Sequence, residues 1–232
     1  MNKSLLHYSY SMKIHTQKRI LFIVLYTLFI LSFTNLFISY VLFPVRQSSE
    51  SMIPDIQENS LVMISPVFKR YERGDIVLMN PRKKLQLTKT QKLMNLMVKF
   101  FTAQQCSIYE KQNFPGTNCQ LRRIVGLPGD RLYMRDYVLY VKPAGSKHYL
   151  TEFEIAESPY NVTFFTAPSE WDSYLGVKGS FDEIVLSENQ YFVLGDNRKS
   201  SDDSRLYGPV NPSDINGKTV LCYFPFSKFR FF

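Results

Sequence analysis

The longest apolar segment of the sequence lies near its amino end. Residues 20–43 form a run of 24 residues without a charged side chain. At about 1.5 Å per residue, a helix of this length can cross a hydrocarbon core of roughly 30 Å. A cleavable secretory signal usually has a shorter apolar region, of about 7 to 15 residues, that ends in small side chains. Because this run is longer and ends in Leu-Phe-Pro, the pattern predicts a retained transmembrane anchor.

Short apolar runs, separated by Gly, Pro and Asn, follow the anchor. An alternating pair of strands is predicted on either side of Arg135 and Asp136, and further strands are predicted at residues 61–64, 76–79, 123–125, 183–186, 191–194 and 218–224. Short strands with turn residues between them are typical of antiparallel β structure. We therefore expect a mainly β fold, with one antiparallel β domain over residues 44–232, a length that suits a single domain.

Two stretches interrupt the pattern of strands. Residues 85–102 place Leu93, Met97 and Phe100 at helical spacing and contain several lysines that could form a polar face. They predict a helical insertion that either lies on the bilayer or packs on the β domain. Residues 145–179, rich in Ser, Pro and aromatic side chains, predict an inserted lobe. With their flanks, the two insertions extend over residues 83–120 and 145–180.

The net charge of +8 is concentrated in two places. Residues 1–19 contain four basic and no acidic side chains, residues 82–111 contain seven basic and one acidic, and the remainder has a net charge of −2. No nucleic-acid-binding motif accompanies these basic blocks, so we expect a lipid bilayer, and no nucleic acid, as the partner of this charge. Acidic residues follow the apolar run. The positive-inside rule therefore predicts that residues 1–19 are cytoplasmic and that the chain from residue 44 onward is outside.

The cysteines and histidines give no metal-binding pattern. Cys106 and Cys119 either close a loop as a disulfide in an oxidising compartment or stay reduced, while Cys222 lies in an apolar run and is predicted to be a buried thiol. The three histidines are scattered along the chain, and the cysteines lack ligand spacing. We therefore expect neither a metal nor a cofactor. Residues 126–129 lack the Lys-Ser/Thr of a nucleotide-binding loop and predict a tight turn.

A serine lies a few residues beyond the apolar run, and four further motifs follow it in order. Ser51 stands in SSESMIP, followed by Met52 and Pro54, and the later motifs are RGDIVLMNP at 73–81, RRIVGLPGD at 122–130, GDNRKSSDDSRLYGPV at 195–210 and GKTVLCYFPF at 217–226. In this order they closely resemble those of the bacterial type I signal peptidases, or leader peptidases, of serine peptidase family S26. The two interruptions lie outside the resemblance.

The resemblance implies an antiparallel β catalytic domain outside the bacterial inner membrane, attached by one N-terminal transmembrane helix. It implies an endopeptidase that removes N-terminal signal peptides from exported preproteins after a small-x-small site. Shallow apolar pockets would admit the small side chains. Ile53, Leu61, Val62 and the strand before Arg122 are the candidates to line them.

The resemblance also implies a role for each polar residue of the motifs. Ser51 matches the nucleophile, whose hydroxyl attacks the scissile carbonyl to give an acyl-enzyme. Ser49 matches the residue whose hydroxyl joins the Ser51 backbone N–H in the oxyanion hole. Ser201 matches the residue that orients the general base, and Asp203 and Arg205 match a supporting ion pair.

Arg122 departs from the family pattern. The family has a lysine at this position, because a desolvated ammonium can lose its proton near neutral pH and the resulting amine can take the proton of the serine. A guanidinium does not lose its proton at working pH, so Arg122 is unsuited to the task of general base.

Three interpretations follow from this departure. In the first, the protein is an active peptidase whose base is another residue, with Lys199 as the nearest candidate in sequence and Lys142 and His148 as weaker ones. In the second, the protein binds signal peptides or partner proteins without turnover, as a membrane-tethered binding or assembly factor. In the third, Arg122 fixes Ser51 and stabilises the oxyanion while water removes the proton.

Overall fold

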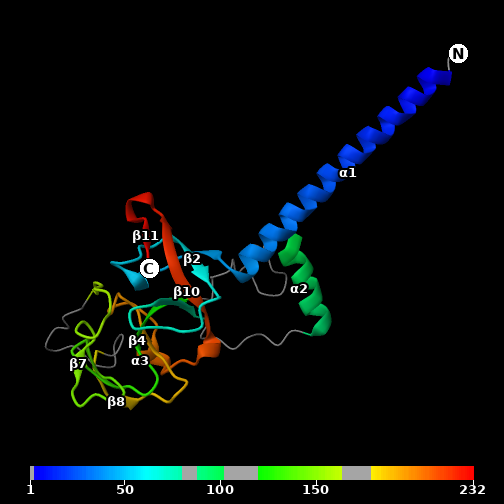
Figure 1. Cartoon of the computed structure of the whole chain (residues 1–232). Helices are drawn as coiled ribbons and strands as arrows, with labels where there is room; N and C mark the ends of the chain where they lie inside the picture. Colours follow the sequence, from blue (N-terminus) through cyan, green and yellow to red (C-terminus); the bar gives the residue numbers. More distant parts are fainter. Residues whose placement is uncertain (1–2, 80–87, 102–119, 164–178) are drawn as a thin grey trace.

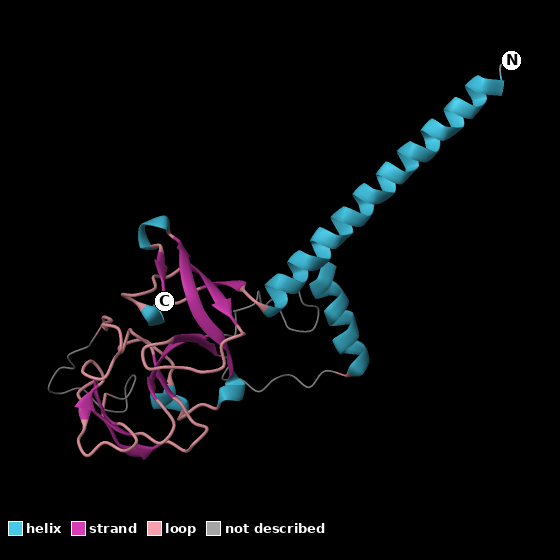
Figure 2. Ribbon diagram, viewed as in Figure 1, coloured by secondary structure: helices cyan, strands magenta, loops and turns pink. Residues whose placement is uncertain are grey.

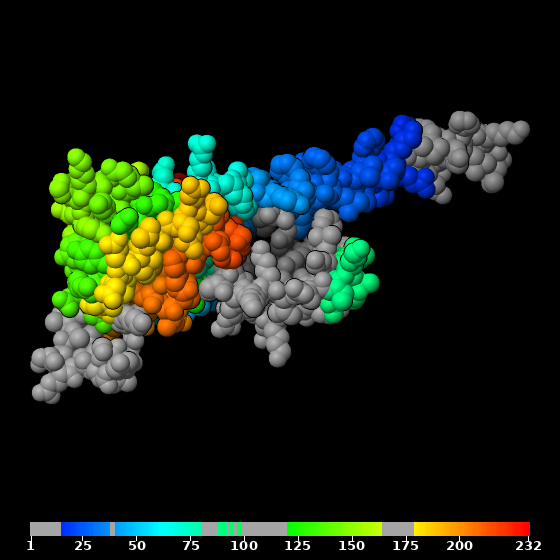
Figure 3. All heavy atoms as spheres, turned by 90° about the horizontal axis from the view of Figure 1, so that it is seen from below, coloured from blue at the N-terminus to red at the C-terminus, as the bar shows by residue number. Residues whose placement is uncertain are grey.

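The computed structural model describes residues 3–79, 88–101, 120–163 and 179–232. A single long helix, α1 (Lys3–Tyr40), carries the amino end away from the folded part of the chain (Figures 1 and 3). Its stretch His15–Phe37 has 23 residues and a mean hydropathy of 2.3, so it is long and apolar enough to cross a membrane, and the described residues bury none of it. The helix ends before residue 43, because Phe43 already pairs with Ile64 in a sheet.

The strands form two antiparallel sheets and are drawn in magenta in Figure 2. The larger sheet has seven strands, in the order β1-β2-β10-β3-β4-β9, with β11 paired to β10. The strands are β1 (Phe43–Arg46), β2 (Leu61–Ser65), β3 (Ile76–Met79), β4 (Gln120–Gly126), β9 (Phe192–Leu194), β10 (Ile215–Phe224) and β11 (Arg230–Phe231). The mainly β, antiparallel fold predicted from the sequence is confirmed. The apolar runs predicted as strands at residues 61–64, 76–79, 123–125, 191–194 and 218–224 each overlap a strand of this sheet.

Strand β3 shows why this sheet is stable. All four of its residues are buried, and they alternate between two clusters: Ile76 and Leu78 pack with Val62, while Val77 and Met79 pack with Ile124 on the other face. Successive side chains of a strand point to opposite faces, so a central strand covered on both sides must be apolar throughout. The run IVLM meets this condition.

The smaller sheet has four strands, in the order β7-β6-β5-β8. They are β5 (Arg131–Arg135), β6 (Val138–Lys142), β7 (Leu150–Thr151) and β8 (Phe181–Val185). Leu132, Met134, Leu139 and Val141 pack against Phe192 and Leu194 of β9, which joins the two sheets through one core. Strand β7 belongs to the stretch predicted as an inserted lobe. At least the beginning of that stretch is therefore part of the small sheet, while residues 164–178 lie outside the described part of the chain.

The other predicted features have mixed outcomes. Helix α2 (Lys89–Phe101) falls within the predicted helical insertion, and Leu93, Met94 and Met97 are exposed on it. Cys222 is a free thiol with only 2% of its surface exposed, as the apolar run around it predicted. Cys106 and Cys119 lie outside the described residues. The short helices are η1 (Glu50–Met52), α3 (Ser204–Tyr207), η2 (Pro212–Asp214) and η3 (Phe226–Lys228).

Candidate active site

Ser51 lies in η1, one turn of 3-10 helix between β1 and β2, and only 3% of its surface is exposed. Met52 beside it is fully buried in the core of the large sheet, which anchors the turn from one side. Gln47, four residues before Ser51, is held by two backbone hydrogen bonds. Its N–H donates to the Ser60 carbonyl (2.9 Å), and its carbonyl accepts from the Asn59 N–H (2.7 Å). The turn is thus fixed at both ends.

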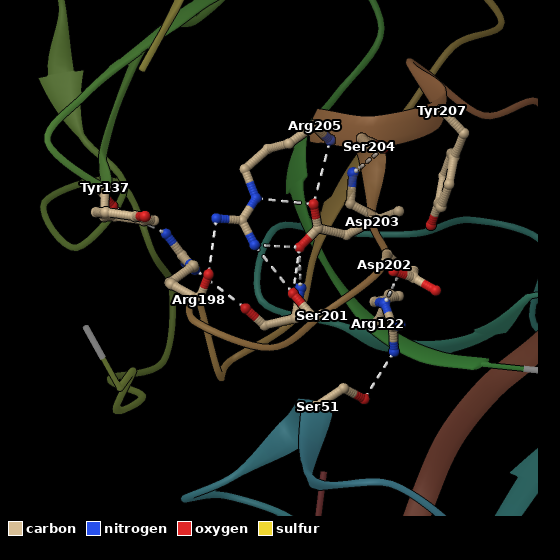
Figure 4. A network of polar contacts seen from close by, with 12 residues as sticks. Ser51, Arg122, Tyr137, Arg198, Ser201, Asp202, Asp203, Ser204, Arg205 and Tyr207 are labelled. Carbon is tan, nitrogen blue, oxygen red and sulfur yellow. Dashed lines mark hydrogen bonds and ion pairs between the residues drawn. The ribbon is translucent and has the colours of Figure 1, made fainter. Parts of the chain in front are cut away.

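Three polar groups surround the Ser51 hydroxyl. A guanidinium nitrogen of Arg122 donates to Ser51 Oγ at 2.8 Å (Figure 4). Gln47 Nε2 lies 3.2 Å from the same oxygen, and Ser49 Oγ lies 3.0 Å from it. Within the parts of the chain that the structure describes, no lysine or histidine nitrogen lies within hydrogen-bond distance of this hydroxyl.

Arg122 is buried, with 3% of its surface exposed, at the third position of β4. Its Nε donates to the Asp202 carbonyl at 2.8 Å, and its terminal nitrogens donate to the Leu121 carbonyl and to Gln120 Oε1. Burial lowers the pKa of Arg122, while the nearby Tyr207 and Asp203 partly offset the effect. Guanidinium starts from so high a pKa that the side chain stays protonated at any working pH. The group opposite Ser51 is therefore a fixed cation.

The loop from Gly195 to Asp203, which joins β9 to α3, holds the turn that carries Ser51. The Asn197 N–H donates to the Ser51 carbonyl at 3.0 Å, and the Asn197 side-chain amide donates to the Glu50 carbonyl at 3.2 Å. A Cβ on Gly195 would lie 2.7 Å from the Ser51 carbonyl oxygen and 2.4 Å from Ser201 Cβ. Only glycine allows the loop to approach the turn this closely.

Ser201, Asp203 and Arg205 form one buried cluster (Figure 4). The Ser201 hydroxyl donates to Asp203 Oδ2, and Arg205 binds Asp203 with two nitrogens, at 2.8 and 2.9 Å, and Ser201 Oγ at 3.0 Å. Burial raises the pKa of Asp203, but the hydrogen bonds from Arg205, Ser201 and the Gly195 N–H lower it more, so the net pKa is below the ordinary value. This carboxylate stays ionised and supports the loop.

A second buried network fixes the same loop from its other side. Arg123, next to the Ser51 partner on β4, binds Asp196 and Asp55, each at 2.6 Å. Arg198 is fully buried and binds Glu152 with two nitrogens. Glu152 follows β7, so an ion pair within the small-sheet region reaches the loop that positions Ser51.

The structure brings together most of the residues that the sequence singled out. Ser49 and Arg122 both contact Ser51, as their predicted places in one site require. Ser201, predicted to orient the residue at position 122, contacts Asp203 and Arg205. Arg122 itself donates to the carbonyl of Asp202, the residue after Ser201.

None of the alternative bases is among the hydrogen-bond partners that the described structure gives for the Ser51 hydroxyl. Lys199 and His148 are exposed, and Lys142 lies on the small sheet, where its ammonium is 6.0 Å from the centre of the Tyr149 ring. Of the candidate pocket residues, Ile53 and Leu61 are partly exposed. Val62 is fully buried in the core and does not line a surface pocket, which corrects the expectation. The reason is the strand alternation, which turns Val62 inward between two partly exposed neighbours.

Gln47 and Asn197 are site residues that the sequence motifs did not reveal. Asn197 stands inside a recognised motif, but its backbone and side chain act on carbonyls of residues 50 and 51, which are far away in sequence. Gln47 precedes the SSESMIP stretch, and a lone glutamine after an apolar run is ordinarily a surface residue. Its 4% exposure and the contacts of its Nε2 with Ser49 and Ser51 place it in the site. No cluster of possible metal ligands is present among the described residues.

Comparison with known proteins gives a consistent set of similarities. The family described as signal peptidase, peptidase S26, matches residues 17–224. The chain is 27% identical over 191 residues to signal peptidase I P of Bacillus subtilis subsp. natto, covering 81% of this chain and 80% of that protein. It is 34% identical over 113 residues to signal peptidase I of Bacillus licheniformis, covering 47% of this chain and 53% of that protein. A crystal structure of a signal peptidase I from Enterococcus faecalis aligns with 22% identity and a TM-score of 0.31, covering 64% of this chain and 96% of that one.

Proposed function

Because the chain belongs to the signal peptidase family, peptidase S26, we propose that it is a membrane-anchored serine endopeptidase that removes N-terminal signal peptides from exported preproteins. Ser51 is its nucleophile, and cleavage follows a small-x-small site. The observation that carries the proposal is the Ser51 hydroxyl, buried in a rigid turn and held at 2.8 Å by the cation of Arg122. A serine placed against a fixed cation is stabilised as it develops negative charge.

Arg122 fixes Ser51 and stabilises negative charge but does not take the proton. In the acylation step, Ser51 Oγ bonds to the scissile carbonyl carbon, the carbonyl electron pair moves onto its oxygen, and the serine proton passes to solvent water. The Ser49 hydroxyl and the Ser51 backbone N–H are the donors for this oxyanion. Collapse of the intermediate expels the amine, which takes a proton from water, and a second water hydrolyses the acyl-enzyme. Ser201, Asp203 and Arg205 support the loop that holds the nucleophile.

We propose that residues 1–19 are cytoplasmic, that the apolar part of α1 spans the bacterial inner membrane, and that residues 44–232 form the peptidase domain outside. The length and hydropathy of the stretch His15–Phe37 support the span. Basic residues such as Lys18 and Arg19 on one side, and acidic residues such as Glu50 and Asp55 on the other, support the orientation. Ile53 and Leu61, partly exposed beside the turn of Ser51, are suited to line a shallow apolar pocket.

A second function is supported by the same cation. The guanidinium of Arg122 donates to the nucleophile and cannot accept its proton, which is the arrangement expected of a family member that binds signal peptides or partner proteins without cleaving them.

The substitution Ser51→Ala separates the two functions. Purified wild type in detergent is expected to cleave a precursor with a small-x-small site, and Ser51→Ala is expected to lose cleavage while still binding the precursor. Cleavage is followed by gel electrophoresis and mass spectrometry of the new amino end. Equal inertness of wild type and Ser51→Ala on several precursors, with binding retained, would support the binding function instead.

A further inference from the structure

The side chain of Gln47 is a buried amide placed against both serines of the site. Its Nε2 lies 2.8 Å from the Ser49 carbonyl oxygen and 3.2 Å from each of the Ser49 and Ser51 hydroxyl oxygens. A buried amide is costly unless it is hydrogen-bonded. All the hydrogen bonds that the structure shows for this nitrogen go to Ser49 and Ser51.

The Ser49 carbonyl fixes the orientation of the amide. A carbonyl oxygen only accepts, so the group 2.8 Å away from it must be the nitrogen of Gln47 and not its oxygen. One N–H of Gln47 is used by this carbonyl. The other N–H is therefore shared between the two serine hydroxyls.

The hydrogen bonds of Ser51 can then be counted. A hydroxyl has two acceptor lone pairs and one donor O–H. Arg122 and Gln47 both donate to Ser51 Oγ and fill its two lone pairs. The only remaining neighbour that the structure shows is Ser49 Oγ at 3.0 Å, so the Ser51 O–H must donate to Ser49.

We propose that Gln47 is a positioning residue that, together with Arg122, directs the proton of Ser51 to Ser49. In this arrangement Ser49 receives the proton of Ser51 and releases its own to water, since Ser49 is exposed to solvent, and the O–H that Ser49 then holds is the one that donates to the oxyanion. The electron pair of the broken O–H bond is the pair that forms the new bond to the substrate carbonyl carbon. Gln47 thus completes a path for the proton that Arg122 cannot accept. The role rests on the proposed function, because it presumes that Ser51 is the nucleophile.

The test replaces the Ser51 hydroxyl by a thiol and measures how readily the thiol loses its proton. This measurement does not require that the protein cleave a substrate. The full chain in detergent carries Ser51→Cys, and the pH dependence of iodoacetamide alkylation at position 51 is followed by peptide mass spectrometry, which separates it from the three native cysteines. Donors aimed at the sulfur favour the thiolate. Adding Gln47→Met removes one donor and is expected to raise the midpoint of the profile by about half to one pH unit.

Two further variants make the test specific. Gln47→Glu keeps the length of the side chain but replaces the donor by a carboxylate, so it is expected to raise the midpoint more than Gln47→Met does. Gln57→Met, the same substitution at an exposed position nearby, is expected to leave the midpoint unchanged. In the protein that retains Ser51, Gln47→Met is expected to lower kcat about tenfold with little change in KM.

The outcomes are distinct from those that test the peptidase. Identical alkylation profiles for Ser51→Cys with and without Gln47→Met or Gln47→Glu would overturn the role of Gln47, even if wild type cleaves precursors. Inert wild type with a shifted thiol profile would overturn the proposed function and leave the hydrogen-bond assignment standing.

Discussion

A buried guanidinium and a buried ammonium differ in what each can do for a serine. Burial lowers the pKa of both, but only the ammonium starts low enough to become a neutral amine near pH 7. In this protein the cation touches the Ser51 hydroxyl at 2.8 Å and is itself held by the Asp202 carbonyl. The Ser51 hydroxyl therefore has a permanent positive charge beside it.

The substitution Arg122→Lys is expected to restore a titratable base at the nucleophile. General bases typically contribute about 10²- to 10⁴-fold to the rate, so precursor cleavage should increase within this range. Wild-type cleavage should rise with pH without levelling off, because the fraction of Ser51 that has lost its proton to solvent keeps increasing, whereas Arg122→Lys should level off above the pKa of the new amine. Initial rates between pH 6 and 10 measure both effects.

Arg122→Met is the control, since it has neither cation nor base, and it should cleave more slowly than wild type. If Arg122→Lys is no faster than Arg122→Met, the position cannot use an amine and the account of Arg122 given above is wrong.

The depressed pKa of Asp203 makes a prediction about stability in acid. A carboxyl whose pKa is lowered on folding contributes stability above its ordinary pKa, and that contribution disappears as the pH falls through the folded value. Asp203→Asn leaves the buried Arg205 without its carboxylate and is expected to cost about 3 kcal/mol at pH 7. Thermal unfolding in detergent should show a gap between variant and wild type that narrows below about pH 4. A gap that stays constant into acid would contradict the assignment.

Among the elements, the loop between β9 and α3 has the largest effect on the site. It binds the carbonyls of Glu50 and Ser51, carries the Ser201 and Asp203 cluster, and is held by the ion pair of Arg198 with Glu152. The small-sheet region therefore helps to position the turn of Ser51 without touching it, since the region after β7 supplies Glu152.

Glu152→Gln is expected to weaken both the fold and the activity. The change leaves the fully buried Arg198 without a counter-charge, which typically costs about 3 to 5 kcal/mol, and it loosens the loop that holds Ser51. The unfolding midpoint and the cleavage rate should both fall.

Glu183→Gln provides the matched control for Glu152→Gln. It breaks the ion pair between Glu183, whose side chain is 43% exposed, and Arg131, whose side chain is 56% exposed. The unfolding midpoint and the cleavage rate should therefore stay nearly unchanged. Equal effects of the two substitutions would show that burial of the ion pair is not what matters.

At the scale of the whole molecule, α1 and the β domain are consecutive structural units that share no secondary-structure element. The helix ends at Tyr40, and the large sheet begins at Phe43, so the anchor contributes no strand to the sheet. The chain thus combines a helix that has no charged side chain from residue 20 onward with a domain that has its own core (Figure 1).

This separation predicts that the anchor alone holds the protein in the membrane. Full-length protein should stay in the membrane pellet after extraction at alkaline pH, while a variant lacking residues 1–40 should fold and appear in the soluble fraction. Protease added outside spheroplasts should digest the β domain of the full-length protein. Release of the full-length protein by alkali would contradict the anchor, and protection from external protease would contradict the orientation.

The sequence by itself determined what depends on local pattern. The uncharged run near the amino end determined the long helix, the short apolar runs determined the strands, and the motif around Ser51 together with the four motifs that follow it indicated the family. Each of these follows from residues that are close in the chain, because side-chain periodicity is a local property. The end of the helix is not set by the local pattern. Phe43 belongs to the apolar run in the sequence, but it pairs with Ile64 in the large sheet and is not part of α1.

Only the tertiary structure decided how the residues of the site meet. Ser51, Arg122 and Asp202 are separated by 71 and 80 positions, and the contacts between them depend on how β4 and the loop after β9 pack around η1. Gln47 carries no motif, yet packing buries its amide against two serines. A candidate nucleophile such as Ser51 can be recognised from the residues adjacent to it in sequence, whereas the direction of its hydrogen bonds depends on groups that folding brings from elsewhere in the chain.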